Sequence, residues 1–556
     1  MAKAFAKKGR AFQAKGRPLD EAALAEITAL VSDLPRRRDL LIEMLHRLQD
    51  GFGALHARHL RALAEWLRLS EAEIFEVASF YHHFDIVKEG GAAPAPLTIR
   101  VCDSVSCMMA GGEALRARLA GLVDPARVRV MAAPCIGACA EAPAALAGRR
   151  LVGHAEAEAL AAMADGPIPG PVLPPYEALA AARAQGRYAM LEACRSGRIS
   201  REQAMAMLSD AGLRGLGGAG FPAGRKWAAV RSQPGPRLMT INGDEGEPGT
   251  FKDRHLLETT PHAMLEGALI AAWAVEAEAI YLYMRDEYPA VLAILAAEIA
   301  AIAAAGLSAG MPIHLRRGAG AYICGEESAM IESLEGKRGL PRHRPPFIAE
   351  RGLFGRPTLN HNIETLAWVP EILARGPDWF AAQGVRGAKG LRRFSVSGRV
   401  REPGIRLMPA GSTAQELIEA CGGMEEGHGF RGYLPGGASG GMLPASLADL
   451  PLDFGRLDEV GCFVGSHAVI VFSEHDDPRA IARNLLAFFT HESCGQCTPC
   501  RLGTEKMTTL LDQPSPDRAL IADLDQVMRD GSICGLGQAA PNPVRSLLRF
   551  FPEALS

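Results

Sequence analysis

Four cysteines near the C-terminus constrain the fold of this chain more than any other feature. Three of them lie in one run, Cys494-Gly-Gln-Cys497-Thr-Pro-Cys500, and Cys534 follows in a separate glycine-rich loop. Three thiolates at this spacing can hold one face of a [4Fe–4S] cluster, and a distant fourth cysteine closes the site. Zinc also binds Cys-x-x-Cys, but usually as two separated pairs, so the spacing favours an iron–sulfur cluster over zinc or a disulfide.

A second set of cysteines forms two pairs in the first third of the chain. Cys102 and Cys107 are five positions apart, and Cys135 and Cys139 are four apart. Each pair follows a predicted strand, and the four thiols suit a [2Fe–2S] cluster with two ligands for each iron. Zinc, or four unrelated buried cysteines, are the alternatives. The other four cysteines have no cysteine neighbours and are expected to be core residues: Cys194, Cys324, Cys421 and Cys462.

The length and composition are typical of a globular chain of several domains. With 556 residues, 48% hydrophobic and 22% charged, the chain is too long for one core, and about three to five domains are expected. The net charge of -3 gives no reason to expect a nucleic acid or a membrane surface as a partner. Twelve cysteines without a secretory signal favour metal ligation in a reducing cytoplasm.

Two segments could be mistaken for targeting or membrane signals. The first eighteen residues carry six basic side chains and no acid, but no apolar segment follows them. We therefore expect a solvated arm there, and contact with a partner subunit is the alternative. The longest apolar stretch, 290–305, is mostly alanine and contains Glu298, so it predicts a buried amphipathic helix and no membrane span.

Hydrophobic periodicity and turn residues divide the chain into six segments. Leucines at helical spacing and a capping box formed by Ser70 and Glu73 predict helices over 20–90, and strands alternating with a helix follow. Five prolines between 166 and 175 make a stiff linker. We expect a multidomain α/β chain with a helical region at 1–95, a small α/β domain at 96–165, the linker at 166–176, a large α/β domain at 177–385, a small β domain at 386–472 and a helical domain at 473–556.

Two loops of the large α/β domain have the residues of a ligand site. The loop 214–227 contains five glycines, which would let backbone N–H groups approach a phosphate beside Lys226. It does not fit the dinucleotide fingerprint, because no clear strand precedes it and Pro222 interrupts it. The acidic loop 242–253 follows a predicted buried strand, where α/β folds bind ligands, and a solvated turn is the alternative. The segment 320–328 repeats this pattern.

Taken in chain order, these motifs closely resemble a known family. The glycine-rich loop, the acidic loop, Tyr322-Ile-Cys-Gly-Glu-Glu327 and the terminal cysteines resemble the flavin- and NADH-binding subunit of respiratory complex I, the 51 kDa type. Residues 20–165 resemble its neighbour, the thioredoxin-like [2Fe–2S] subunit of the 24 kDa type. The segment 386–472 resembles the SLBB domain, a ubiquitin-like β-grasp fold. The joining of both subunits by a linker is similar to the fused diaphorase subunits of NAD-linked formate dehydrogenases and NAD-reducing hydrogenases.

The resemblance implies FMN and NAD(H) as cofactors beside the two clusters. The FMN phosphate and ribityl chain would be lined by Gly215, Gly217 and Lys226. The flavin would be contacted by Asn242, Asp244, Glu245, Gly325, Glu326 and Glu327. Around NAD(H), Phe221 and Phe347 would sandwich the adenine, Tyr322 would lie near the cofactor pair, and Glu247 would lie beside the nicotinamide as the catalytic residue. The clusters would be held by Cys102, Cys107, Cys135 and Cys139, and by Cys494, Cys497, Cys500 and Cys534.

Three positions depart from the family's pattern. The family has paired asparagines where this chain has His361-Asn362, so only Asn362 and Thr365 carry over as cofactor contacts. A lysine near the NADH ribose is Arg344 here, and an aromatic residue after the loop tryptophan is Ala229. These departures concern the pose of NAD(H).

The implied reaction moves electrons between NAD(H) and metal clusters. A nicotinamide exchanges two electrons as a hydride and a cluster carries one, so FMN belongs between them. From the resemblance we expect a cytoplasmic NAD-dependent oxidoreductase, the diaphorase subunit that reduces NAD+ with electrons from formate. Its partner would be a large subunit with a molybdenum or tungsten cofactor and further iron–sulfur clusters. The alternatives are a hydrogenase diaphorase, a fused complex I subunit, and a carrier that has lost flavin, which the intact loops argue against.

Overall fold

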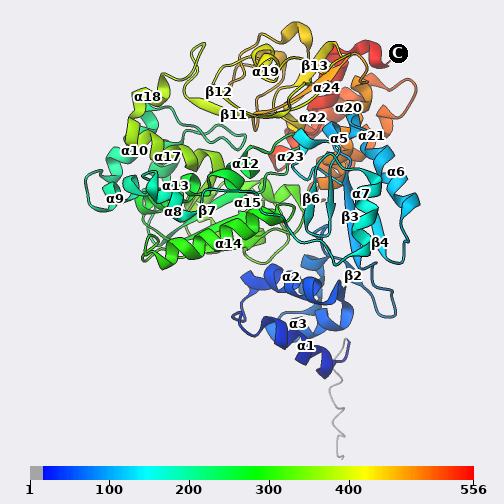
Figure 1. Cartoon of the computed structure of the whole chain (residues 1–556), viewed down its shortest axis with the longest axis vertical. Helices are drawn as coiled ribbons and strands as arrows, with labels where there is room; N and C mark the ends of the chain where they lie inside the picture. The colour runs from blue at the N-terminus through cyan, green and yellow to red at the C-terminus, as the bar shows by residue number, and fades with distance from the viewer. Residues whose placement is uncertain (1–16, 556) are drawn as a thin grey trace, which may run out of the picture.

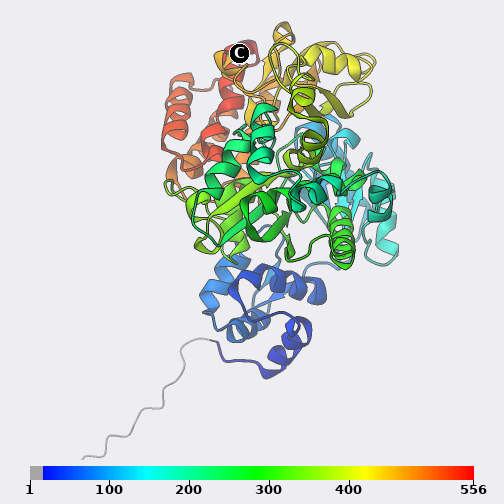
Figure 2. The ribbon, with the colours of Figure 1, turned by 90° about the vertical axis from the view of Figure 1, so that its left-hand side faces the viewer.

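The structure, a computed structural model, describes residues 17–555. The predicted basic arm falls almost entirely on 1–16 and so lies outside the described residues. A helical region forms one end of the molecule, α/β layers form its middle, and the C-terminal segments form the other end (Figures 1 and 2). Among the described helices, none combines the length and apolar character needed to cross a bilayer.

The N-terminal region consists mainly of helices, as predicted. Their bounds are α1 Glu21–Val31, α2 Leu41–Phe52, α3 Ala57–Leu67 and α4 Glu71–Ala78. The predicted capping box is present, because the Glu73 N–H donates to the Ser70 hydroxyl and the Glu73 carboxylate accepts from the Ser70 N–H. Two parallel strands, β1 Leu55–His56 and β2 Ile86–Val87, were not predicted, since strands of two residues show no alternation.

The next unit is a four-stranded sheet with the order β4-β3-β5-β6. Its strands are β3 Leu97–Cys102, β4 Val128–Ala133, β5 Ala145–Ala147 and β6 Arg150–Val152, and its helices are α5 Val105–Met109, α6 Gly112–Leu122 and α7 Ala157–Ala162. β3 and β4 are parallel, and β5 and β6 are antiparallel to their neighbours. Because Cys102 is the last residue of β3 and Cys135 follows the end of the parallel strand β4, both pairs reach the same edge of the sheet. Between Asp165 and Leu179 the chain has neither helix nor strand.

The central sheet consists of four parallel strands in the order β10-β7-β8-β9. They are β7 Arg237–Gly243, β8 Ala277–Met284, β9 Ile313–Arg317 and β10 Thr358–Asn362. The helices of this region are α8 Leu179–Ala184, α9 Ala189–Arg195, α10 Arg201–Asp210, α11 Ala223–Arg231, α12 Lys252–Thr259, α13 Pro261–Val275, α14 Pro289–Ala304, α15 Glu327–Leu334, α16 Ile348–Arg351, α17 Ile363–Arg375 and α18 Pro377–Ala381. The chain runs from β7 outward to β9 and then returns to place β10 on the other side of β7. Ligands bind α/β sheets at such a reversal, outside the carboxyl ends of the strands.

The alanine-rich stretch forms α14, as predicted, and buries Glu298. The Glu298 carboxylate accepts from the Tyr176 hydroxyl at 2.9 Å and from the Leu179 N–H at 3.0 Å. These bonds attach the end of the proline-rich linker to the central region.

The small β domain and the C-terminal helices complete the chain. The five-stranded sheet has the order β12-β11-β15-β13-β14, with α19 Ala414–Ala420 beside it. Its strands are β11 Leu391–Gly398, β12 Gly404–Pro409, β13 Phe430–Leu434, β14 Leu443–Pro444 and β15 Ala468–Ser473. The helices are α20 Pro478–Glu492, α21 Thr498–Leu511, α22 Arg518–Gly531, α23 Gly535–Ala539 and α24 Asn542–Phe550.

Candidate functional site

The reversal between β7 and β10 brings two predicted site residues together. Asn242 and Asn362 are partners in the register of the two strands, at their carboxyl ends. Asn242 Nδ2 donates to the Gly325 carbonyl at 2.8 Å, which links this edge to the segment 320–328. Asn362 Oδ1 accepts from the Glu364 N–H at 3.0 Å and so caps α17.

The glycine-rich loop is held against the same edge. The Leu216 N–H donates to Thr365 Oγ1 at 2.8 Å, and both residues are buried. A Cβ added to Gly217 would lie 3.1 Å from the Asn362 side chain, so this glycine allows a close approach to β10. The loop therefore presents its backbone at the sheet edge without any strand before it.

Lys226 connects the glycine-rich loop to the segment 320–328. Its Nζ donates to the Asn360 carbonyl at 3.2 Å and lies 3.6 Å from the Glu327 carboxylate. Arg344 also lies 3.6 Å from Glu327 and pairs with Glu326, whose carboxylate caps the start of α15. Two cations and two carboxylates thus form one network beside the loop.

Asp244 carries the clearest sign of a bound molecule. Its Oδ2 is buried and has no hydrogen-bond partner among the described residues. Burial raises the pKa of this carboxyl group well above its usual range. A Cβ added to Gly325 would lie 3.3 Å from the Asp244 carbonyl oxygen, so the two loops are in close contact here. A buried acceptor without a donor is costly, and a ligand with an N–H or O–H group would satisfy it.

Glu247 lies where three regions of the chain meet. Its Oε1 accepts from the Ser439 N–H at 2.7 Å and from the Ser439 hydroxyl at 2.6 Å, and its Oε2 accepts from the Tyr322 hydroxyl. The Tyr322 N–H donates to Glu492 on α20 at 2.8 Å, and Asn542 Nδ2 donates to the Ser439 carbonyl at 2.8 Å. Burial raises the pKa of Glu247. The β domain and the C-terminal helices therefore orient this predicted catalytic residue.

The Glu245 carboxylate is already hydrogen-bonded by groups of the protein. It accepts from the N–H groups of Asp253 at 2.7 Å and Arg254 at 3.0 Å, at the start of α12, and from the Tyr288 hydroxyl at 3.1 Å. Burial raises its pKa to about 7. Its position shapes the acidic loop, and its oxygens already have donors without a ligand.

The two predicted adenine-binding aromatics are exposed. Phe221 is 46% exposed and Phe347 is 52% exposed. The Arg225 guanidinium lies 5.7 Å from the Phe221 ring centre. Exposed aromatic faces of this kind are suited to stack on a planar ligand.

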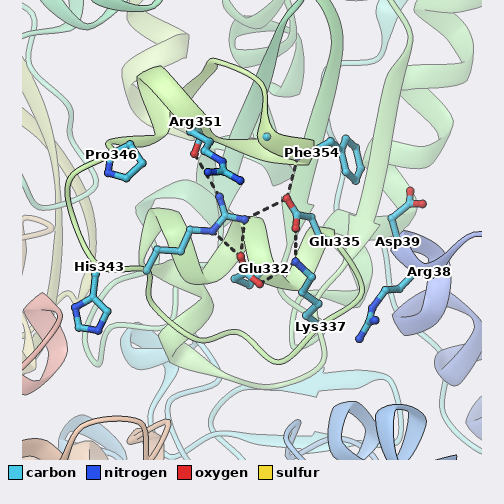
Figure 3. Close-up of a pocket in the computed structure, with 11 residues that line it drawn as sticks. Arg38, Asp39, Glu332, Glu335, Lys337, His343, Pro346, Arg351 and Phe354 are labelled. Atoms are coloured by element: carbon cyan, nitrogen blue, oxygen red, sulfur yellow. Dashed lines mark hydrogen bonds and ion pairs between the residues drawn. The ribbon is translucent and has the colours of Figure 1, made fainter. Parts of the chain in front are cut away.

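A cavity of about 600 Å³ lies between the segment 332–355 and the N-terminal region. Most of its lining residues are charged; they come from α15, α16 and the chain around these helices and, at Arg38 and Asp39, from the N-terminal region (Figure 3). Arg342 pairs with Glu332 and with Glu335, the latter at 3.1 Å, so much of the lining charge is internally compensated. None of the predicted site residues lines this cavity.

The four cysteines of the first set converge at the edge of the small sheet. All four are buried, and Cys135 Sγ lies 3.3 Å from Cys139 Sγ. The pKa of Cys102 is raised by the neighbouring thiols of Cys107 and Cys135 and by burial. All twelve cysteines lie in the described part of the chain and none of them forms a disulfide. Four free thiols in contact are a donor set for a metal centre.

The second cysteine set gathers at two helix starts. Cys497 precedes α21, Cys500 lies in its first turn, and Cys534 precedes α23. Burial raises the pKa of Cys500 to about 11 and that of Cys534 to about 12. The N–H groups of Gly537 and Leu536 lower the pKa of Cys534, but less than burial raises it. A bound metal would hold these groups as thiolates.

Comparisons with known proteins identify the regions. The chain matches the Nuo51 FMN-binding domain over 208–371, the iron–sulfur binding region of NADH-ubiquinone oxidoreductase-F over 480–556, the thioredoxin-like [2Fe–2S] ferredoxin over 27–166 and the SLBB domain over 393–442. It is 38% identical over 371 residues to the second F-type subunit of the NADH-quinone oxidoreductase of Rhizobium meliloti, covering 64% of this chain and 88% of that protein. The chain belongs to the family of F-type subunits of NADH-quinone oxidoreductase.

Other matches extend this assignment. The F-type subunit of Aquifex aeolicus is 40% identical over 370 residues, covering 64% of this chain and 85% of that protein. A chain of an NAD+-reducing [NiFe]-hydrogenase in the air-oxidized state superposes with a TM-score of 0.83 at 34% identity, covering 94% of both chains. This member of the F-type family is an NAD(H)-dependent oxidoreductase module with FMN, a [4Fe–4S] and a [2Fe–2S] cluster, and it fuses the 24 kDa-like and 51 kDa-like parts.

The residues at the edge formed by β7 and β10 and in the two cysteine sets fit these cofactors. The unpartnered Asp244 oxygen and the glycine-rich backbone suit FMN, and the two free cysteine quartets suit the clusters. Sequence reasoning missed Ser439 and Glu492, which orient Glu247 and Tyr322 from distant segments. It also missed Arg285, although this residue follows a predicted strand, the same signal that pointed to the acidic loop.

Proposed function

We propose that the chain exchanges a hydride between NAD(H) and FMN at the edge formed by β7 and β10 and passes electrons singly to a partner. The observation that carries this proposal is the buried, unpartnered Asp244 oxygen at the end of β7, next to Gly325 of the segment 320–328. When bound, FMN exchanges two electrons with a nicotinamide and single electrons with iron–sulfur clusters. The protein supplies binding, orientation and electrostatics.

The roles of the residues follow from their contacts. Gly215 and Gly217 would admit the FMN phosphate to backbone N–H groups, and Lys226 would add a positive charge. Asn242 and Asp244 would contact the flavin from the end of β7. Glu245 would hold the acidic loop in shape through its bonds to the start of α12.

The nicotinamide side would be formed by residues from several segments. Glu247 would border the nicotinamide, held by Ser439 and Tyr322. Phe221 and Phe347 would stack on the adenine. The remaining cofactor contacts would come from Gly325, Glu326, Glu327, Arg344, Asn362 and Thr365, and the metal ligands would be Cys102, Cys107, Cys135, Cys139, Cys494, Cys497, Cys500 and Cys534.

The test of this role is NADH-dependent reduction of an artificial acceptor by the FMN-loaded protein. In the Glu247→Gln variant we expect kcat/KM for NADH to fall at least about tenfold, which corresponds to about 1.4 kcal/mol of lost transition-state stabilisation. Glu298→Gln is the matched control, because Glu298 is also buried and also accepts from a tyrosine hydroxyl and a backbone N–H. Normal NADH kinetics in Glu247→Gln would refute the assignment of Glu247.

The partner subunit that donates the electrons has two candidates. We assign a formate-oxidising partner subunit with a molybdenum or tungsten cofactor as the first candidate. The second candidate is a hydrogenase partner, which the match to a chain of an NAD+-reducing [NiFe]-hydrogenase favours. Purification of the complex, metal analysis, and assays of formate-dependent against hydrogen-dependent NAD+ reduction would separate them. Nickel with hydrogen-dependent activity would refute the formate assignment.

A further inference from the structure

Arg285 connects the [2Fe–2S] cysteine loop to the acidic loop of the flavin site. It follows β8 and is only 4% exposed. Its Nη2 donates to the Cys135 carbonyl at 2.7 Å, and its Nη1 donates to the Glu245 carbonyl. One rigid guanidinium thus fixes the distance between the two loops.

Neighbouring residues hold this guanidinium in place. The Glu287 carboxylate accepts from Nε at 3.2 Å and lies 3.0 Å from Nη2, so both residues form a buried ion pair. The guanidinium also lies 4.9 Å from the ring centre of Tyr288. Tyr288 in turn packs on Gly137 of the cysteine loop, where an added Cβ would lie 2.1 Å from the tyrosine oxygen. The cysteine loop is therefore shaped to receive this arginine and its neighbours.

We propose that Arg285 is a positioning residue that holds the Cys135 loop against the flavin site and raises the reduction potential of the [2Fe–2S] cluster. The proposal rests on the proposed role of Cys135 as a cluster ligand. Reduction adds a negative charge to the cluster, and a buried cation next to it stabilises the reduced form because screening is weak there. Glu287 opposes this effect, so the two residues set the potential with opposite signs.

The experiment is a redox titration of the purified holoprotein, followed by the EPR signal of the [2Fe–2S] cluster. In Arg285→Gln we expect the ratio of reduced to oxidised cluster at a fixed potential to fall about tenfold, equivalent to a shift of about 59 mV for a one-electron couple. In Glu287→Gln we expect the potential to move in the opposite direction. Arg316→Gln is the control, because Arg316 is also a buried arginine with two carboxylate partners, Asp39 at 3.3 Å and Glu43 at 3.1 Å, and touches no cysteine loop.

The outcomes decide the proposal in each case. Opposite shifts in the two variants, with none in Arg316→Gln, support it. An unchanged potential in Arg285→Gln, or the same shift in Arg316→Gln, overturns it. If Arg285→Gln does not retain the cluster, Glu287→Gln alone decides, and a lowered or unchanged potential there overturns the proposal. FMN content and NADH-dependent acceptor reduction in the same preparations report separately on the proposed function.

Discussion

Replacing Thr365 by valine should loosen the glycine-rich loop and weaken FMN binding. Thr365 Oγ1 is the acceptor for the Leu216 N–H at 2.8 Å, and Leu216 and Thr365 are 0% and 1% exposed. Valine is similar in shape but leaves this N–H without a partner, and a buried unsatisfied donor costs about 1–3 kcal/mol. If the whole cost falls on the FMN-bound loop, the Kd for FMN rises about 5- to 150-fold.

The assay is a titration of the apoprotein with FMN, followed by the quenching of flavin fluorescence. Thr365→Ser is the control, because it keeps the hydroxyl acceptor and removes only a methyl group. We expect serine to bind FMN nearly as tightly as the natural residue. Equal affinities of the valine and serine variants, with both apoproteins folded, would show that the Leu216 bond does not hold the FMN site.

Three further predictions concern the cofactor sites and the core. Because burial raises the pKa of Asp244, its ionisation opposes folding of the apoprotein as the pH rises above the usual aspartate range. Asp244→Asn should therefore raise the free energy of unfolding at neutral pH by about 1–3 kcal/mol, measured by urea denaturation, and should weaken FMN binding. A variant less stable than the natural protein would contradict this prediction. Cys534→Ser should abolish the [4Fe–4S] EPR signal while FMN is retained. The control Cys462→Ser changes an isolated buried cysteine and should leave the [4Fe–4S] EPR signal unchanged. A Cβ at Gly267 would lie 1.9 Å from the Leu366 carbonyl oxygen, so Gly267→Ala should destabilise the α13–α17 packing by about 1–3 kcal/mol, and an unchanged Tm would disprove the tight contact.

Local patterns were sufficient for most of the fold. The helix that begins after Ser70 and the strands that lead to the cysteines were predicted because capping, periodicity and turn residues act over short distances. The order β10-β7-β8-β9 was not predicted, because strand order depends on contacts between segments far apart in the sequence. That order places Asn242 beside Asn362 and so creates the edge where the site lies.

The site was predictable where a motif supplies the residues and not where the fold supplies them. Asp244 and the cysteines lie in motifs that can be recognised in the sequence. Ser439 is 192 positions from Glu247, and no local pattern connects the two. The same holds for Arg285, which reaches a cysteine loop 150 positions earlier.

The proline-rich segment that precedes α8 has a consequence for dilute solutions. The F-type relatives described above match 64% of this chain, and the [2Fe–2S] part matches a separate family model, the thioredoxin-like [2Fe–2S] ferredoxin, over 27–166. Here that part is covalently joined to the FMN part, so the effective concentration of one part at the other is set by the linker and not by the concentration of the protein. The contact made by Arg285 therefore forms within one molecule and does not depend on the concentration of the protein. Dilution that would separate two subunits leaves this junction, and the equal number of both parts, unchanged.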